Sequence, residues 1–288
     1  MERYLNIAKK ITRRCTISLY ILAAICVCTM FLTAQSNGIA IKDSKAKEAV
    51  DAAHKALGGA DKVNGIKSLV MSGTGTNAVF TLTNQGPMKT TGSITYEFEI
   101  RILLPDNIFQ VEMVNKGGSL PSSTTYRIVS NGEAFIRTMP ELLTSSNVNA
   151  SKSSNLINRQ LQEMARLLIG MLIKAGPMPL TVTSGSTPER FTITTTGGGN
   201  ETYEVEFDAK GKYPSIVRYK IPSVKMLDRE IGIEQNVMMK FRERVVVDGV
   251  MFPRVITSKA EAMDREMRIE KIQINPKLTL KDFEIPEQ

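Results

Sequence analysis

Two glutamates, Glu97 and Glu99, are the first residues of this chain whose type and spacing could support chemistry. They lie in the segment 92–103, GSITYEFEIRIL, where apolar and polar residues alternate strictly. Alternation predicts a strand, and a pair of carboxylates on one face of it could act as acid and base. A one-sided sheet buries its apolar face, so we interpret the glutamates as part of a solvated outer face. The apolar residues of the opposite face are Ile94, Tyr96, Phe98, Ile100 and Ile102.

The single histidine, His54, restricts the catalytic machinery further. It lies among alanines in the segment 43–58, with no second ligand or basic partner near it in the sequence. A Ser-His-Asp triad or a histidine-rich zinc site is therefore not indicated, and the chain contains no G-x-S-x-G or H-E-x-x-H spacing. We interpret His54 as a packing or surface residue, and we expect no catalytic residue, no metal site, no cofactor and no enzymatic activity.

A glycine-rich stretch, ALGGADKVNGIKSLVMSGTGT at 56–76, resembles a phosphate-binding loop at first sight. A dinucleotide fingerprint follows a strand and opens a helix, whose N-terminus meets the phosphate. Here the residues after Gly73 and Gly75 are of β type, so no helix follows. We instead predict that Gly58 ends a helix and that the glycine pair lies within the first strand. There it would permit sharp curvature or the close approach of a lid or ligand.

The first 34 residues have the pattern of an export signal. Five basic residues precede an apolar run at 15–32, and the small residue Ala34 follows it. This arrangement predicts a cleaved signal peptide, or a membrane anchor if it is not cleaved. The three cysteines lie within this leader but not in a lipobox, so we do not expect a lipoprotein. They are Cys15, Cys26 and Cys28.

Residues 35–288 are accordingly expected to form one exported domain in the periplasm or cell envelope. Without cysteine they can have no disulfide framework, so the domain depends on its hydrophobic core. Loss of the leader removes five basic residues and one acidic residue, which lowers the net charge from +8 to +4. A charge this mild does not suggest nucleic-acid binding.

Strand patterns at short intervals dominate the remainder of the chain. The segment after the turn at 104–107 carries aligned apolar residues, and Asn131-Gly132 and Asp248-Gly249 are typical of tight hairpin turns. With one helix near 43–58, this organisation predicts a mainly β (α+β) domain with antiparallel strands in a barrel or sandwich. The aligned residues are Phe109, Val111 and Met113, and the further strand segments are 124–139, 189–221, 236–259 and 265–275.

One segment, about 153–176, departs from the strand pattern. Its apolar residues recur at helical spacing, and Gly176-Pro177 follows it. We predict an apolar-faced helix between strands, for which the concave side of the sheet is an available surface. Its methionines are flexible enough to line a surface for variable apolar ligands, although ordinary core packing is the alternative. The residues of this face are Leu161, Met164, Leu168 and Met171.

Four stretches in order resemble the periplasmic lipoprotein-carrier family, which contains the outer-membrane lipoprotein-sorting proteins. They are GSITYEFEIRILLPDNIFQVEM, YRIVSNGEAFIRTMP, RFTITTTGGGNETYEVEFDAKGKYPSIVRY and LTLKDFEIPEQ, which together span most of 92–288. The sequence departs from the family at Leu104, where the family carries an arginine that helps to hold the lid shut. It also has an extra hairpin around VVVDGVMFPRVI.

The resemblance implies an incomplete antiparallel β-barrel with a helical lid over its open end and acyl chains inside. On this basis the hydrophobic cavity would be lined by the two strands named above, and the helix at about 153–176 would be the lid. We expect a monomeric, non-enzymatic carrier or binding protein for the acyl chains of lipids or lipoproteins, acting in outer-membrane lipoprotein sorting. The alternative is an envelope sensor or interaction module that regulates a protein partner, and envelope membrane proteins are further candidate partners. Nucleic acid is not expected as a partner.

Overall fold

The computed structural model describes most of the chain from residue 38 onward. The described ranges are 38–83, 86–118, 121–140, 148–187, 189–196, 200–208, 212–221, 224–226, 229–231, 234–261 and 263–284. The predicted leader at 1–34 lies outside them, as do the predicted glycine turns at 197–199 and 211. The chain divides into a unit that ends at Ile39 and a larger one that begins at Ala40, and the fold of the larger unit is described below.

The larger unit is mainly β, with three α-helices and one 3₁₀ helix among the described residues. The helices are α2 (Ser44–Ala56), α3 (Ala60–Asn64), α4 (Ser154–Leu172) and the 3₁₀ turn Leu280–Phe283. The first strands are β1 (Ile39–Ile41), β2 (Ser68–Thr83), β3 (Gly86–Leu103), β4 (Ile108–Gly118), β5 (Ser123–Ser130), β6 (Glu133–Met139) and β7 (Val148–Ser151). The later ones are β8 (Leu180–Ser184), β9 (Arg190–Thr195), β10 (Thr202–Phe207), β11 (Pro214–Ile221), β12 (Val224–Met226), β13 (Arg229–Ile231), β14 (Gln235–Val247), β15 (Val250–Ala260) and β16 (Met263–Ile274).

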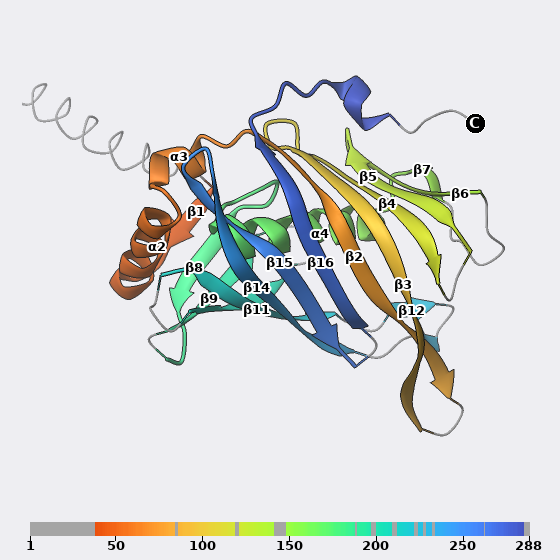
Figure 1. Ribbon diagram of the computed structural model, residues 1–288. Helices are drawn as coiled ribbons and strands as arrows, with labels where there is room; N and C mark the ends of the chain where they lie inside the picture. The colour runs from red at the N-terminus through yellow and green to blue at the C-terminus, as the bar shows by residue number, and fades with distance from the viewer. Residues whose placement is uncertain are drawn as a thin grey trace, which may run out of the picture. The chain divides into compact units, whose positions relative to one another are not determined.

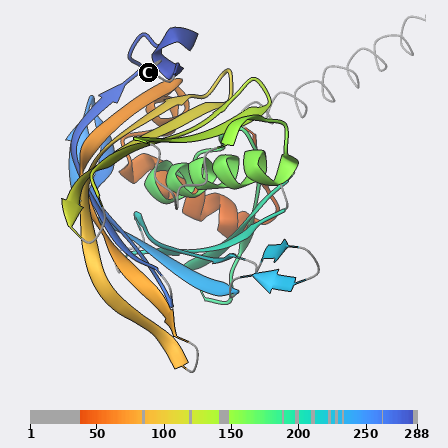
Figure 2. The ribbon, with the colours of Figure 1, turned by 90° about the vertical axis from the view of Figure 1, so that its right-hand side faces the viewer.

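Fourteen of these strands form one sheet that does not close on itself. Its order is β1-β8-β9-β10-β11-β14-β15-β16-β2-β3-β4-β5-β6-β7, and β12 pairs with β13 in a separate ribbon. The pairings from β8 through to β7 are antiparallel. The sheet curves strongly around α4 (Figure 2). The prediction of an incomplete antiparallel barrel with a helix is confirmed.

The hairpin turns form where the sequence predicts them. Asn131 and Gly132 have φ of 51° and 71°, and Asp248 and Gly249 have φ of 50° and 77°. Two consecutive residues with positive φ match the right-handed twist of the strands that they join, and asparagine, aspartate and glycine tolerate this conformation best. The turns set the β5–β6 and β14–β15 registers, and with them the face on which each side chain lies.

The predicted N-terminal helix is α2. The Asp43 side chain accepts a hydrogen bond of 2.8 Å from the Ala46 backbone N–H and so caps the helix. Ala46, Val50 and Ala53 are buried, which is the apolar stripe expected from their spacing. The chain then leaves the helix through Gly58, at a φ of 118° that favours glycine.

Gly73 and Gly75 lie in β2, and no helix follows them, so the phosphate-loop interpretation is excluded. Their close neighbours are parts of the sheet itself. A Cβ on Gly75 would lie 2.4 Å from Cζ of Tyr96, and one on Gly73 would lie 2.0 Å from the backbone oxygen of Arg268. We expected either sharp curvature or the close approach of a lid or ligand here. The glycines instead make room for the Tyr96 ring and for the neighbouring strand.

Helix α4 lies on the concave side of the curved sheet (Figures 1 and 2). It contacts β4, β5 and β6 on one arm of the sheet and β11 and β15 on the other. It ends earlier than the predicted 176, because Ile173 adopts the left-handed conformation with φ of 48° and its N–H bonds back to Ile169. Among the described residues no helix has the length and apolar character needed to cross a membrane.

Candidate functional site

The predicted cavity residues share the concave face of β3 and β4. Cross-strand pairing arranges six of the eight, with their β2 neighbours, in three rows. The rows are Leu69–Ile102–Phe109, Met71–Ile100–Val111 and Gly73–Phe98–Met113. Six of the eight predicted residues are at most 3% exposed, while Ile94 and Met113 are partly exposed. The strand pattern thus brings the predicted set together on one apolar surface, which is covered rather than open in this structure.

Helix α4 is a major part of that cover. Of the predicted lid residues, Met164, Leu168 and Met171 have no exposed surface, and Leu161 is partly exposed. Every residue from 167 to 173 is buried, whereas every residue from 154 to 159 is exposed or partly exposed. A helix segment that is buried on all sides belongs to the core. The C-terminal half of α4 is therefore a core element, and only its N-terminal half has the burial expected of a movable cover.

A polar stripe of α4 faces protein rather than solvent. The carboxylate of Glu163 accepts hydrogen bonds from both terminal guanidinium nitrogens of Arg127 on β5, at 2.7 and 3.1 Å. Nη1 of Arg265 on β16 lies 3.8 Å from the same carboxylate. The Arg265 Nε donates a 2.8 Å hydrogen bond to the hydroxyl of Tyr96. We call these four residues, Glu163, Arg127, Arg265 and Tyr96, the Glu163 latch.

The electrostatics of the latch favour the charged carboxylate. Burial by itself would raise the pKa of Glu163, because a low-dielectric surrounding penalises charge. The positive charges of Arg127, Arg265 and Arg166 outweigh burial, so the pKa of Glu163 lies below its ordinary value. The bidentate Arg127 contact is also the geometry in which arginine binds carboxylates most specifically. At neutral pH the latch is an ion pair that joins the helix to two strands.

A second group, the Arg166 cluster, ties the next turn of α4 to the other arm of the sheet. It consists of Arg166, Glu201, Tyr203 and Tyr219. The Arg166 guanidinium binds the carboxylate of Glu201 and lies 4.1 Å from the ring centroid of Tyr219. The hydroxyl of Tyr203 donates to the same carboxylate. Burial raises the pKa of Tyr203 and of Tyr219, so both stay neutral phenols.

The C-terminal end of α4 is held by close packing and by α2 and α3. A Cβ on Gly170 would lie 2.0 Å from Cζ of Phe241, so the helix backbone lies directly against that ring. Nε2 of His54 lies 3.0 Å from the backbone oxygen of Ile173, and His54 is only 6% exposed. Nζ of Lys174 donates to the backbone oxygen of Asn64 at 3.0 Å. His54 is therefore a packing residue, which is one of the two predicted alternatives, and it donates a hydrogen bond to a backbone carbonyl at the end of the helix.

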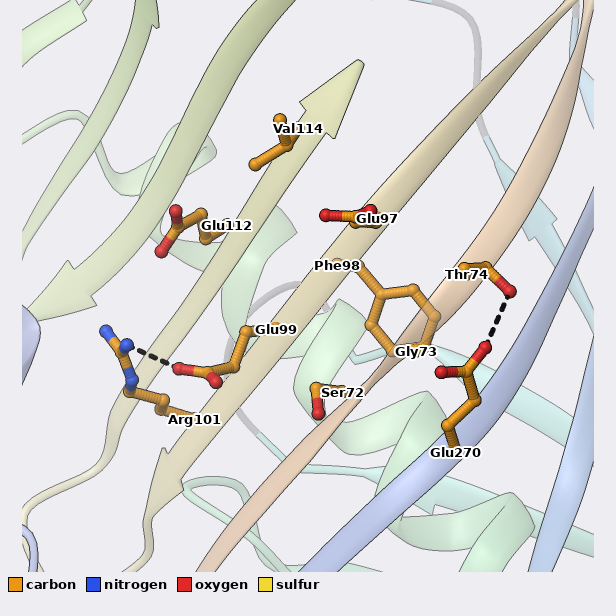
Figure 3. A pocket seen from close by; sticks show the side chains of 10 residues that line it. All are labelled: Ser72, Gly73, Thr74, Glu97, Phe98, Glu99, Arg101, Glu112, Val114 and Glu270. Atoms are coloured by element: carbon orange, nitrogen blue, oxygen red, sulfur yellow. Dashed lines mark hydrogen bonds and ion pairs between the residues drawn. The ribbon is translucent and has the colours of Figure 1, made fainter. Parts of the chain in front are cut away.

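The glutamates singled out first lie on the opposite, convex face. Figure 3 shows them in a shallow hollow of about 400 Å³ over β2, β3, β4 and β16. Glu97 pairs with Lys116 at 2.9 Å, and Glu99 pairs with Arg101. The two carboxylates thus have separate basic partners. Their arrangement is that of a solvated outer face, as the alternation in the sequence indicates.

The sequence analysis missed the charged residues of the latch and the Arg166 cluster. Glu163 and Arg166 lie three positions apart on a helix, and a polar pair of this kind is normally expected to face water. Arg127 and Arg265 interrupt strands whose inward positions are otherwise largely apolar or small. The sequence did contain one signal that these arginines face inward, namely the period-two alternation of each strand. Arg127 alternates in step with Val129, and Arg265 in step with Met267 and Ile269.

Comparisons with known proteins found matches among solved structures. No family model matches the chain, and no curated protein matches it significantly. A solved outer membrane lipoprotein-sorting protein domain from Vibrio parahaemolyticus, described as putative, is similar over 83% of this chain and 97% of its own, at 8% identity and a TM-score of 0.47. A DUF1329 family protein from Desulfovibrio piger is similar over 84% and 98%, at 10% identity and a TM-score of 0.34. The first neighbour bears the name of the family that the sequence resembles. At these identities and TM-scores, neither assigns an activity to this chain.

Proposed function

We propose that this protein is an exported, non-enzymatic carrier or binding protein that holds the acyl chains of lipids or lipoproteins on the concave face of its half-barrel, in the periplasm or cell envelope. Its role would be in outer-membrane lipoprotein sorting. The observation that carries the proposal is the division of α4. Its C-terminal half is core, but its N-terminal half is partly exposed and is attached to β5 and β6, beside the predicted cavity strands, through polar contacts such as the Glu163 latch.

The geometry of the attachment supports an opening movement of the N-terminal half. Gln160 and Glu163 bind β6 and β5, next to the predicted cavity strands. Arg166 and Gly170 contact β11 and β14 on the other arm. Lifting the first turns of the helix would therefore open the side of the concave face at β5 and β6, next to the predicted cavity strands, and leave the C-terminal anchor in place. A polar latch suits such a movement because water can solvate the separated charges.

The energetics are adequate for tight binding without a reactive group. Burial of an acyl chain of about sixteen carbons contributes on the order of 12 kcal/mol, at roughly 0.8 kcal/mol per methylene. The costs of lifting the helix and ordering the ligand are subtracted from this amount. The acyl chain alone can therefore supply the binding energy, and no reactive group is needed for a carrier of this kind.

The first test is direct. The protein is purified from cells, its bound lipids are extracted, and the extract is identified by mass spectrometry. The delipidated protein is then titrated with N-phenyl-1-naphthylamine, a neutral probe whose fluorescence rises in apolar surroundings. We expect co-purified acyl chains and saturable probe binding. A delipidated protein that binds no probe, but forms a stable complex with another envelope protein, would favour the sensor alternative.

A crosslink tests the movement of α4. With Cys15, Cys26 and Cys28 replaced by serine, Arg127→Cys and Glu163→Cys place two thiols where the latch joins β5 to the helix. A short bis-maleimide that bridges them should abolish probe binding, and a reducible version should restore it after reduction. The uncrosslinked double variant is the matched control. Full probe binding by the crosslinked protein would contradict the proposal that the helix must lift.

A further inference from the structure

The Glu163 latch contains more positive than negative charge. Arg127 and Arg265 both approach one carboxylate, and the third side chain, Tyr96, is a neutral phenol. Their side chains are largely buried, at 25% exposure for Arg127 and 19% for Arg265. If Glu163 moves away with the helix, two guanidinium groups remain beside an apolar surface without their anion. Uncompensated charge in such a place is costly, so the open state requires another anion or water there.

The two arginines stand on either side of the predicted acyl surface. In the sheet order β16-β2-β3-β4-β5, Arg265 comes from the first strand and Arg127 from the last. Arg127 continues the row of Ile100 and Val111, and Arg265 pairs with Asn77, which pairs with Ile94. Both side chains therefore share the concave face with the apolar rows. A ligand whose tail lies on those rows would have its head group within reach of the arginines.

The geometry points to Arg127 and Arg265 as the binding site for an anionic head group, which replaces the Glu163 carboxylate when the N-terminal half of α4 lifts. The inference rests on the proposed function and names its ligand class: an amphiphile whose head is a carboxylate or a phosphate. Glu163 is then a built-in competitor that occupies the head-group site in the closed state. The guanidinium fork that holds Glu163 at 2.7 and 3.1 Å binds either anion with the same bidentate geometry.

A further polar group lies beside this site. The Oδ1 atom of Asn77 is buried and has no hydrogen-bond partner among the described residues. Buried amide oxygens are usually satisfied, so an unsatisfied one next to a proposed ligand site is notable. Asn77 is the cross-strand neighbour of Arg265, on the same face of the sheet. A hydroxyl of a lipid head group is the kind of donor that would satisfy it.

The experiment compares three ligands with the same tail, hexadecanoic acid, hexadecyl phosphate and hexadecanol, by displacement of N-phenyl-1-naphthylamine from the full chain. We expect one or both anions to bind at least about tenfold more tightly than the alcohol, because charged hydrogen bonds are lost in the neutral ligand. The two anions distinguish a carboxylate from a phosphate head. Inorganic phosphate alone is the fourth arm, and it should displace no probe because the tail provides most of the binding energy.

The variants separate the head-group site from the fold. Arg127→Gln removes the bidentate fork and leaves Glu163 with only the more distant Arg265, so the double variant Glu163→Gln, Arg127→Gln is used beside it to avoid a poorly paired buried carboxylate. Both should lose most of the preference for anions while they keep hexadecanol binding. Glu163→Gln alone should tighten binding of all three ligands and retain the preference. Arg268→Gln, which removes an arginine from an exposed pair with Glu243, is the matched control and should change neither quantity.

The outcomes are distinguishable. Equal binding of the anions and the alcohol by the unaltered protein, or an anion preference that survives in the double variant, overturns the head-group site but leaves acyl binding in place. Absence of binding for all three amphiphiles, even by Glu163→Gln, overturns the proposed function together with this inference. If inorganic phosphate binds without a tail, and this binding is lost in Arg127→Gln, the site is one for free anions, which contradicts an amphiphilic ligand.

Discussion

Gly170 of α4 lies against the ring of Phe241 on β14, so closely that a Cβ on Gly170 would be 2.0 Å from Cζ of the ring. This contact brings the helix backbone down onto the sheet next to the Arg166 cluster. It also shows that the C-terminal half of α4 is fitted to the sheet in detail and does not rest loosely over it. The C-terminal half of the helix is thus held by close packing, whereas its N-terminal half is held by ion pairs and hydrogen bonds.

Gly170→Ala should destabilise the domain by about 1–3 kcal/mol, because the added methyl forces the helix away from the Phe241 ring. Urea unfolding followed by circular dichroism measures this change. The second substitution, Phe241→Leu, replaces the ring with a smaller side chain and should recover some of the loss, so that the two changes are not additive. An additive pair, each with its full cost, would show that the two residues do not act on each other.

Glu163 should make the stability of the protein depend on pH in the acidic range. Its pKa in the folded protein lies below the ordinary value of 4.5, so its contribution is fully present above pH 4.5. The contribution is lost as the pH falls through the lower folded pKa. The groups that face the carboxylate are Arg127, Arg265 and Arg166, none of which titrates in this range.

The measurement is the difference in unfolding free energy between the unaltered protein and Glu163→Gln at pH 7 and at pH 3. We expect Glu163→Gln to be less stable than the unaltered protein at pH 7 and closer to it at pH 3. Glu234→Gln serves as the control, since the pair of Glu234 with Lys220 is exposed and should contribute little at either pH. A constant difference for Glu163→Gln across this range would contradict a charged latch.

His54→Ala should loosen the end of α4, because the buried backbone oxygen of Ile173 would lose its partner at a cost of about 1–3 kcal/mol. Hydrogen exchange should speed up most for the amides of Ile173 and Lys174, whose acceptors are the carbonyls of Ile169 and Leu168. His54→Gln keeps an amide donor and is expected to restore part of the protection. Unchanged exchange in His54→Ala would mean that apolar packing alone holds this end.

Aspartate substitutions, one in each half of α4, should differ in how much they destabilise the domain. Leu168 has no exposed surface, so Leu168→Asp should cost about 4 kcal/mol or more and approach the stability of the whole domain. Leu161 is partly exposed, and Leu161→Asp should leave the domain folded. Thermal unfolding compares the two. A stable, cooperatively folded Leu168→Asp variant would contradict the assignment of this half to the core.

Local sequence patterns were sufficient for the strands, the hairpins and the shared apolar face. Period-two alternation in 92–103 places Tyr96, Phe98 and Ile100 on one side because a strand allows no other arrangement. Asn131-Gly132 and Asp248-Gly249 mark their turns because few other residues tolerate two consecutive positive φ angles. These properties depend only on neighbouring residues, so the sequence by itself determined them.

The tertiary structure alone decided where α4 lies and what its polar residues meet. Helical spacing predicted an apolar face, but it could not show that residues 167–173 are enclosed on every side. Nor could it pair Glu163 with Arg127, 36 positions away, and with Arg265 on a strand near the end of the chain. Such pairs form because the curved sheet brings its two arms to the same helix, and curvature summed over fourteen strands is not encoded in the period of any one segment.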